Sequence, residues 1–234
     1  MRCNSPEAAL ARGLDDSRTA WKEVAKSALR CLPEKLIAWR SRAHSAVALT
    51  FDDGPDEYTP GILDVLKRFD ARATFFLVGQ RIAGNETVVR RILQEGHEIG
   101  NHSFSHPDFD GLSIRDAIDE VDRTQSVLEK TTGRRCKWFR PPKGKLCAAS
   151  LASAWSKGLS IAMWSIDVKD FRAHHPQDIV AKLDATRIAC GDIVLYHGNN
   201  EAAFAALPQV IEHAVAAKGP LVPVSALIGG ARRA

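Results

Sequence analysis

The sequence is poor in cysteine and has no apolar stretch long enough to cross a membrane. The five cysteines among 234 residues form no CxxC pair, which argues against zinc-finger and thioredoxin-like motifs. The N-terminus also lacks the continuous apolar core that a secretory signal needs. We therefore expect a soluble cytoplasmic protein whose thiols are reduced and mostly structural.

Dense clusters of basic residues, repeats and linkers are missing as well. The formal net charge is +4, from 32 Lys and Arg against 28 Asp and Glu. Nucleic-acid-binding proteins neutralise phosphates with clustered Lys and Arg, so we expect no nucleic acid partner. Without low-complexity tracts or Gly- and Pro-rich linkers, a chain of this length predicts one main domain.

The first 45 residues differ from the rest of the chain. Apolar residues from Trp21 to Leu32 recur with the period of one helical face, basic residues lie elsewhere around that helix, and Pro33 ends or bends it. Such a helix either packs on the main domain or lies, with residues 18–42, on the inner surface of an anionic membrane. We assign 1–45 to an N-terminal helical extension, 46–228 to the main domain and 229–234 to a C-terminal tail.

From Ala46 onward, short runs rich in β-branched and aromatic residues alternate with helical patterns. This alternation predicts an α/β fold of about seven parallel strands joined by right-handed crossovers. Both a doubly wound sheet and an incomplete (β/α) barrel fit, but no GxGxxG follows the first strand, so dinucleotide binding loses its main support. The predicted strands cover 46–51, 73–79, 97–103, 137–140, 160–167, 192–197 and 221–224.

Polar residues follow nearly every predicted strand, at the end where parallel α/β folds bind ligands. Asp52 and Asp53 close the first strand in "LTFDDGP". A turn explains one aspartate, but two adjacent carboxylates repel unless a cation intervenes. Successive strand side chains point to opposite faces, so we expect the two to divide their roles, with one binding a metal and the other free to act as a base.

His102 and His106 are four residues apart, and Pro107 favours a loop there over a helix. A histidine pair by itself is more often a surface or capping feature. Two imidazoles with an aspartate from another strand end, however, are a common ligand set for a catalytic divalent metal.

Three further residues suggest charged pairs. Arg140 stands in the rigid apolar setting of "FRPP", where it needs an acidic partner. It forms either a purely structural ion pair or a pair with an aspartate of the first strand. His197 follows the buried run "DIVLY" and is either a satisfied core histidine or, if paired with Asp170, a general acid.

The five segments "TFDDGP", "HSFSH", "RPPKG", "DVKD" and "LYH" resemble, in this order, the motifs of the polysaccharide deacetylase family, the NodB-homology domain or carbohydrate esterase family four. The likeness spans about Val47 to Leu227. It implies that the main domain is a distorted, incomplete (β/α) barrel and a metal-dependent hydrolase that removes acetyl groups from N-acetylated amino sugars.

The resemblance also assigns roles to single residues. Asp53, His102 and His106 resemble the metal triad, for which Zn²⁺ is the first choice and Co²⁺, Ni²⁺ or Mn²⁺ are also suitable, and Asp52 resembles the general base. Arg140 would orient Asp52, His197 would be the general acid, and Asp170 would tune it. The substrate-binding and oxyanion group would comprise Pro142, Lys143, Gly144, Phe171 and Tyr196, with the oxyanion accepting the backbone N–H of Lys143.

Two residues depart from the family pattern: Lys143 stands where an aromatic residue is usual, and Phe171 where a Trp is usual. The Lys143 side chain either contacts an anionic group of the substrate or is solvated. We expect a substrate in the form of an acetylated oligosaccharide, polysaccharide or lipid-linked glycan precursor. The alternatives are the same barrel acting on an N-formyl group or an O-acetyl ester, and a catalytically silent carbohydrate-binding protein, which would need no base, acid and metal together.

Overall fold

The computed structural model describes residues 27–42, 45–216 and 219–229. The chain divides into two units, Met1–Pro33 and Glu34–Ala234, which are considered separately. Most of the predicted amphipathic helix and of the predicted C-terminal tail lies outside the described residues, and within the first unit only residues 27–29 are described as helical. Among the described helices, none combines the length and the apolar composition that a membrane span requires.

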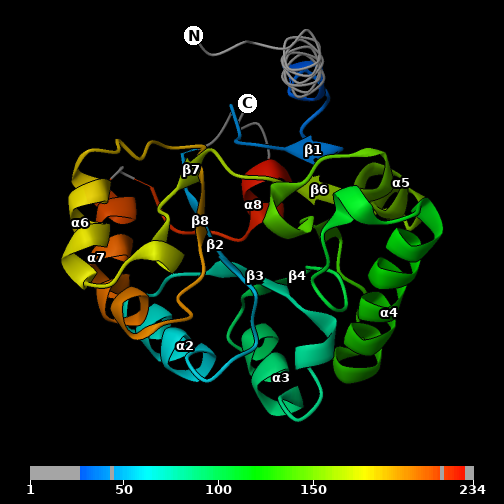
Figure 1. Cartoon of the computed structure of the whole chain (residues 1–234). Coiled ribbons are helices and arrows are strands. Elements are labelled where there is room, and N and C mark those ends of the chain that lie inside the picture. Colours follow the sequence, from blue (N-terminus) through cyan, green and yellow to red (C-terminus); the bar gives the residue numbers. More distant parts are fainter. Residues whose placement is uncertain (1–26, 43–44, 217–218, 230–234) are drawn as a thin grey trace, which may run out of the picture. The chain divides into compact units, whose positions relative to one another are not determined.

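The second unit is built on a parallel sheet whose described strands follow the order β1-β6-β5-β4-β3-β2-β8-β7 (Figure 1). This confirms the predicted α/β class with parallel strands. The strands are β1 (Ile37–Ala38), β2 (Ala48–Asp52), β3 (Ala73–Leu77), β4 (Glu98–Asn101), β5 (Trp138–Phe139), β6 (Ser160–Ala162), β7 (Ile166–Asp167) and β8 (Ile193–Tyr196).

The sheet must curl, because consecutive strands β6 and β7 belong to its opposite ends. The four steps from Ala162 to Ile166 can span at most about 14 Å, so the two ends of the sheet lie close together. Ser165, between them, donates its N–H to the Ile193 carbonyl at 3.0 Å. An isolated antiparallel bridge joins Arg40 to Asp192 at the same seam. The two ends of the sheet therefore meet through isolated contacts and not through continuous strand pairing, which confirms the predicted incomplete barrel.

Three sequence predictions need correction. The single strand predicted at 160–167 is two strands in different parts of the sheet. At 221–224 only Leu221 forms a bridge, to Val47, and helix α8 (Val224–Gly229) begins directly after Pro223. Strand β1 lies inside the range assigned to the N-terminal extension, yet it pairs with β6. Its two residues lie in a segment that the sequence pattern assigns to the helical extension, so no strand is predicted there.

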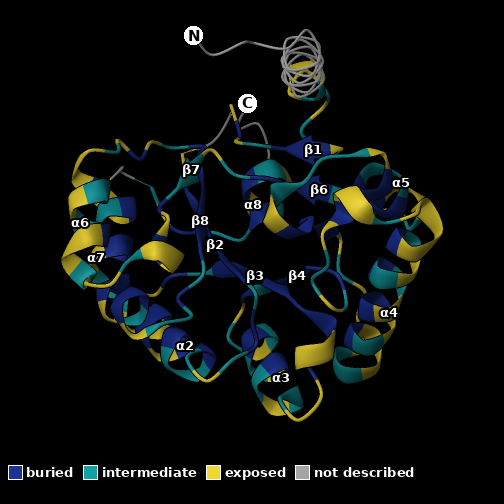
Figure 2. Ribbon diagram, viewed as in Figure 1, coloured by how far each residue is buried: buried dark blue, intermediate teal, exposed yellow. Residues whose placement is uncertain are grey.

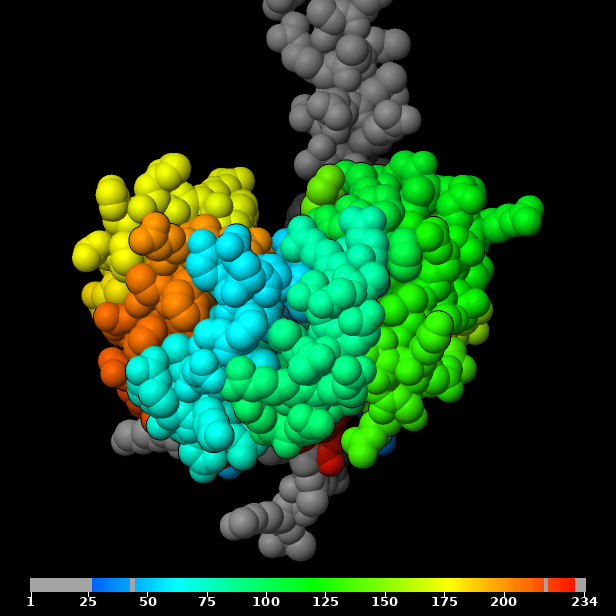
Figure 3. Space-filling model, turned by 90° about the horizontal axis from the view of Figure 1, so that it is seen from below, coloured from blue at the N-terminus to red at the C-terminus, as the bar shows by residue number. Residues whose placement is uncertain are grey.

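The larger helices cover the outer face of the sheet and follow one another around it, so that α7, α2, α3 and α4 appear in orange, cyan, blue-green and green in the space-filling view of Figure 3. Pro at an N-terminal position opens α2 and α6, and Gly133 in a left-handed conformation ends α4. The helices are α2 (Thr59–Arg68), α3 (Glu86–Gln94), α4 (Ile114–Thr132), α5 (Ala148–Ser156), α6 (Pro176–Asp184) and α7 (Glu201–Ala216).

Alternation along the strands separates two packed layers. Leu49, Phe51 and Phe75 point outward into the main apolar core beneath the helices. Ala48 and Phe76 point inward and belong to a smaller cluster that includes α8. The strands are accordingly buried on both faces (Figure 2). Thr50 and Asp52 share the inward side with Ala48, so this pleat brings a carboxylate into the barrel at the carboxyl end of β2.

Candidate active site

The charged residues predicted from the sequence gather at the carboxyl ends of the strands. Asp52 is the last residue of β2, Asn101 the last of β4 and Phe139 the last of β5, directly before Arg140. Asp53 adopts a left-handed φ of 70° just beyond β2. The pleat therefore ends at Asp52, and Asp53 turns back toward the same site instead of pointing to the opposite face, as strand alternation alone had predicted.

Asp53, His102 and His106 form a cluster with the character of a metal site. Asp53 Oδ1 lies 3.4 Å from His102 Nε2 and 3.2 Å from His106 Nε2, and one ligand atom from each residue lies within 4.8 Å of the others. Asp53 Oδ1 is buried and has no hydrogen-bond partner in the described part of the chain. A buried carboxylate oxygen without a partner is costly, and a divalent cation would satisfy it, so these three residues fit a metal ion.

The protonation of the cluster also suits metal binding. Burial works to raise the pKa of Asp53, but the adjacent imidazoles hold that pKa well below its usual range. Burial lowers the pKa of His106, and His102 lowers it further. His102 Nδ1 lies 2.7 Å from the Arg140 carbonyl, which accepts its proton and leaves the Nε2 lone pair facing Asp53. The site therefore presents an ionised carboxylate and, on His102, a ring nitrogen that is available to a metal ion.

Arg140 is completely buried and supplies the counter-charge of Asp52, whose Oδ1 lies 2.7 Å from Arg140 Nη1. The same nitrogen donates to Thr50 Oγ1 at 2.8 Å, and the guanidinium stacks on Phe76 with 4.1 Å to the ring centroid. Nε and Nη2 donate to the carbonyls of residues 162 and 163, each at 2.9 Å. This network fixes one Asp52 oxygen on the arginine, while the other lies 3.7 Å from His102 Nε2.

His197 is paired with the fully buried Asp170. Asp170 Oδ1 lies 3.0 Å from His197 Nδ1, while Oδ2 accepts the backbone N–H groups of His197 at 2.9 Å and Gly198 at 2.8 Å. Burial alone would lower the pKa of His197, but the hydrogen bond and charge of Asp170 outweigh it and raise this pKa to about 9. The imidazole is therefore protonated at neutral pH, as a general acid must be.

The turn η3 (Pro142–Gly144) brings Lys143 to the site. Lys143 and Gly144 have left-handed φ values of 55° and 65°. A Cβ at position 144 would lie 2.5 Å from the ring of Trp164, so this position requires glycine. No hydrogen bond in the described part of the chain uses the Lys143 N–H, which leaves it available to a substrate oxygen. The Lys143 ammonium lies 3.3 Å from Asp108, and both side chains are exposed.

The other residues predicted to bind substrate differ in whether their side chains reach the surface. Phe171 is exposed, and its ring meets that of His197 edge-on at 5.2 Å between centroids. Pro142 is buried beneath the turn. The assignment of Tyr196 to the substrate side is wrong for its side chain, which is fully buried against Phe51 and donates its hydroxyl to the Ala203 carbonyl. Alternation along β8 explains this, because His197 and Tyr196 face opposite sides.

Sequence reasoning missed several residues that support the site. Thr50 could have been found, because it precedes Asp52 by two positions on one strand face. Asn101 Oδ1 accepts the Ser103 N–H at 2.8 Å, and Ser103 Oγ accepts the His106 N–H at 3.1 Å. Glu120 accepts hydrogen bonds from the same loop but lies far along the sequence, on α4, where no local pattern marks it.

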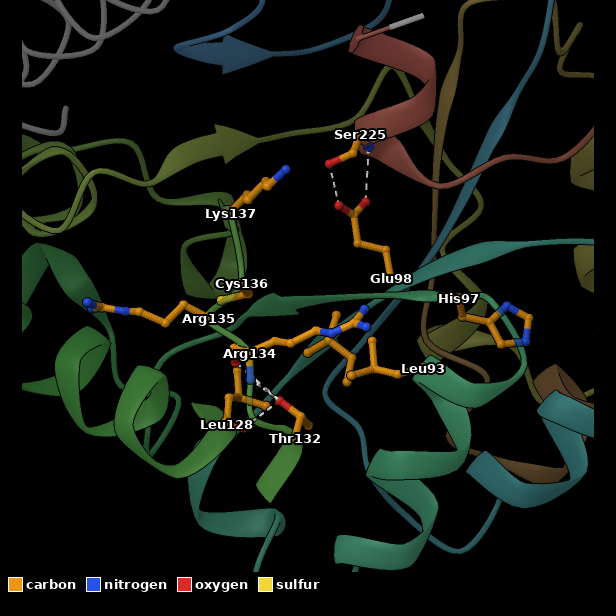
Figure 4. Close-up of a pocket in the computed structure, with 11 residues that line it drawn as sticks. Leu93, His97, Glu98, Leu128, Thr132, Arg134, Arg135, Cys136, Lys137 and Ser225 are labelled. Atoms are coloured by element: carbon orange, nitrogen blue, oxygen red, sulfur yellow. Dashed lines mark hydrogen bonds between the residues drawn. The ribbon is translucent and has the colours of Figure 1, made fainter. Parts of the chain in front are cut away.

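A separate pocket of about 230 Å³ lies at the opposite end of β4 and β5 and contains none of the predicted site residues (Figure 4). There the Glu98 carboxylate accepts both the N–H and the hydroxyl of Ser225. Burial raises the pKa of the Cys136 thiol in this pocket to about 12, so it is unreactive at neutral pH. Among the cysteines that the structure describes, Cys31, Cys136 and Cys147 form no disulfide.

Comparison with known proteins places this site in a family. The model of the polysaccharide deacetylase family matches residues 40–162. A peptidoglycan-N-acetylglucosamine deacetylase of Bacillus cereus is 37% identical over 152 residues, which cover 64% of this chain and 55% of that protein. The peptidoglycan-N-acetylmuramic acid deacetylase PdaC of Bacillus subtilis is 35% identical over 182 residues, 77% of this chain and 38% of the relative. The chain thus matches only about half or less of the length of these relatives.

Solved structures agree with the sequence matches. The structure of PdaC superposes with a TM-score of 0.72 at 33% identity, covering 79% of this chain and 90% of that one. BA3943 of Bacillus anthracis, a CE4 family pseudoenzyme, superposes with a TM-score of 0.76 at 28% identity and covers 83% of this chain and 69% of its own. On the fold, the motifs and these matches together, the chain belongs to the polysaccharide deacetylase family.

Proposed function

We propose that this chain is a metal-dependent N-deacetylase that releases acetate from N-acetylated amino sugars in an oligosaccharide, a polysaccharide or a lipid-linked glycan precursor. One observation carries the proposal: the Asp53, His102 and His106 cluster, the arginine-bound Asp52 and the aspartate-bound His197 share one end of one sheet. Because the family fold also occurs in a pseudoenzyme, these side chains and not the fold support the activity.

A divalent ion held by Asp53, His102 and His106 would polarise the acetamido carbonyl and lower the pKa of a bound water. Asp52 removes a proton from the attacking water, and the buried Arg140 holds this carboxylate in place. The free N–H of Lys143 donates to the developing oxyanion. His197, protonated through its contact with Asp170, gives its proton to the leaving sugar amine, and acetate is released.

Removal of the metal should abolish acetate release. Dialysis against a chelator is expected to reduce acetate release from short N-acetylglucosamine oligomers to background, and Zn²⁺ or Co²⁺ should restore it. The reason is that the proposed reaction needs a cation to polarise the acetamido carbonyl and activate the water. Metal content is measured alongside, and N-formyl and O-acetyl sugars are tested as controls. A protein that binds metal but releases acetate from no N-acetylated sugar would refute the proposed reaction.

The pH dependence should report His197. Because the acid must be protonated and its pKa is raised to about 9, kcat is expected to hold through neutral pH and fall as the pH rises past about 9. Asp170→Asn keeps an oxygen for the backbone N–H groups but removes the charge that raises this pKa, so the falling limb should move to lower pH. A falling limb at the same pH in both proteins would argue against His197 as the acid.

A further inference from the structure

The loop that carries both imidazoles of the metal cluster is held along its backbone from two sides. On one side, the carbonyl oxygens of Ser103 and Phe104 accept the N–H groups of Gly79 at 3.0 Å and Gln80 at 2.9 Å, from the turn η1 (Gly79–Arg81). On the other side, the N–H groups of Phe104 and Ser105 point to α4. The polar backbone groups at the centre of this loop are thus satisfied by two different elements.

The α4 side of this clamp is a single carboxylate. Glu120 Oε2 accepts the N–H of Phe104 at 2.9 Å and that of Ser105 at 2.8 Å, and Oε1 accepts the Ser105 hydroxyl at 2.9 Å. One turn later on the same helix, the guanidinium of Arg123 stacks on the Phe104 ring, 3.8 Å from its centroid. Hydrogen bonds to a carboxylate are stronger than those between neutral backbone groups, so the contacts with Glu120 hold the loop more strongly than the contacts with the turn η1.

The loop needs such an anchor because its backbone is strained. Ser103 and His106 have left-handed φ values of 66° and 60°, which non-glycine residues keep only where the surroundings hold them. The two imidazoles also differ in their own support. The His102 ring is fixed by the Arg140 carbonyl. Within the described residues no hydrogen bond fixes the His106 ring, so its place beside Asp53 depends on the loop backbone.

We propose that Glu120 is a positioning residue of the metal site. It holds the backbone of residues 104–105 so that the His106 ring meets Asp53 and His102, and it thereby sets the affinity for a divalent cation. This role rests on the proposed metal-dependent function, but the anchoring itself belongs to the metal-free protein. Groups that orient metal ligands from behind typically change metal affinity by ~10- to 100-fold when they are lost.

Two substitutions with a matched control test this role. Glu120→Ala removes all three acceptor contacts, and Glu120→Gln keeps an oxygen that can accept the two N–H groups. Glu129→Ala is the control, because Glu129 lies on the same helix and its side chain forms an exposed ion pair with Arg135, at 3.8 Å. In metal-free protein, hydrogen exchange at the Phe104 and Ser105 amides should be fastest in Glu120→Ala, intermediate in Glu120→Gln, and at the wild-type rate in Glu129→Ala.

Metal binding gives the second readout. The dissociation constant for Zn²⁺, measured by competition with a chromophoric chelator, should rise by about tenfold or more in Glu120→Ala and stay close to wild type in the other two variants. Unchanged amide exchange and unchanged Zn²⁺ affinity in Glu120→Ala would overturn the proposal. If Glu120→Ala does not fold, unchanged exchange of the Phe104 and Ser105 amides in Glu120→Gln would overturn the proposal instead. A wild type that binds no Zn²⁺ refutes the proposed function instead, and exchange in the metal-free proteins still decides whether Glu120 holds the loop.

Discussion

Replacing Asp52 by Asn is expected to lower kcat for acetate release by about 10²- to 10⁴-fold, the usual contribution of a general base. An amide has the shape of the carboxylate but cannot take a proton from water. Asp52 stands outside the set of ligand atoms formed by Asp53, His102 and His106, so the metal content of the purified variant should equal that of the wild type. Steady-state kinetics together with metal analysis measure both quantities on one preparation.

The control for this prediction is Asp64→Asn, which removes an exposed carboxylate of α2 that pairs with Arg91 and should leave kcat unchanged. Two results would contradict the assignment. Loss of metal in Asp52→Asn would make Asp52 a ligand instead of the base. A kcat within tenfold of wild type would place the base elsewhere.

Arg140→Met is expected to lower the free energy of unfolding by about 3–5 kcal/mol, the cost of leaving a buried charge without its partner. The variant keeps a long apolar side chain against Phe76 but removes every hydrogen bond of the guanidinium. Asp52, of which only 4% is exposed, then stays buried without a counter-charge. Denaturant unfolding measures the loss through the midpoint and the m-value.

A double-mutant cycle separates charge from packing. Arg140→Met combined with Asp52→Asn should be less destabilised than Arg140→Met alone, because the unpaired carboxylate is gone. Arg135→Met provides the surface control, since its ion pair with Glu129 is exposed and should contribute less than about 1 kcal/mol. A loss of only this size in Arg140→Met would mean that another group compensates Asp52.

Much of the site was predictable because its residues follow strand ends. His102 and His106 lie four residues apart, and together with an aspartate at the end of another predicted strand they suggested metal chemistry. The pairing of Asp170 with His197 was one of two alternatives that the sequence left open, and it is the one that the structure contains. In contrast, the orientation of Asp53 depends on a left-handed φ, which no residue pattern announced.

The missed features share a physical cause: they depend on contacts that are distant in sequence. The family resemblance predicts Tyr196 in the substrate-binding group, whereas its ring is buried in the core against Phe51 from a different strand. Glu120 lies on a helix whose apolar and polar faces give no sign of the loop it contacts. Strand β1 has two residues, and its pairing with β6 is visible only when the sheet is complete.

The seam between the two ends of the sheet links the candidate active site to global stability. Arg140 donates to the Ala162 and Met163 carbonyls, at the point where the chain passes from β6 toward β7. A fluctuation that parts the sheet ends would also move these carbonyls, loosen the guanidinium and release the Asp52 carboxylate. The position of the Asp52 carboxylate therefore depends on contact between the two ends of the sheet, and the slowest-exchanging amides of the seam should exchange together with those around Arg140.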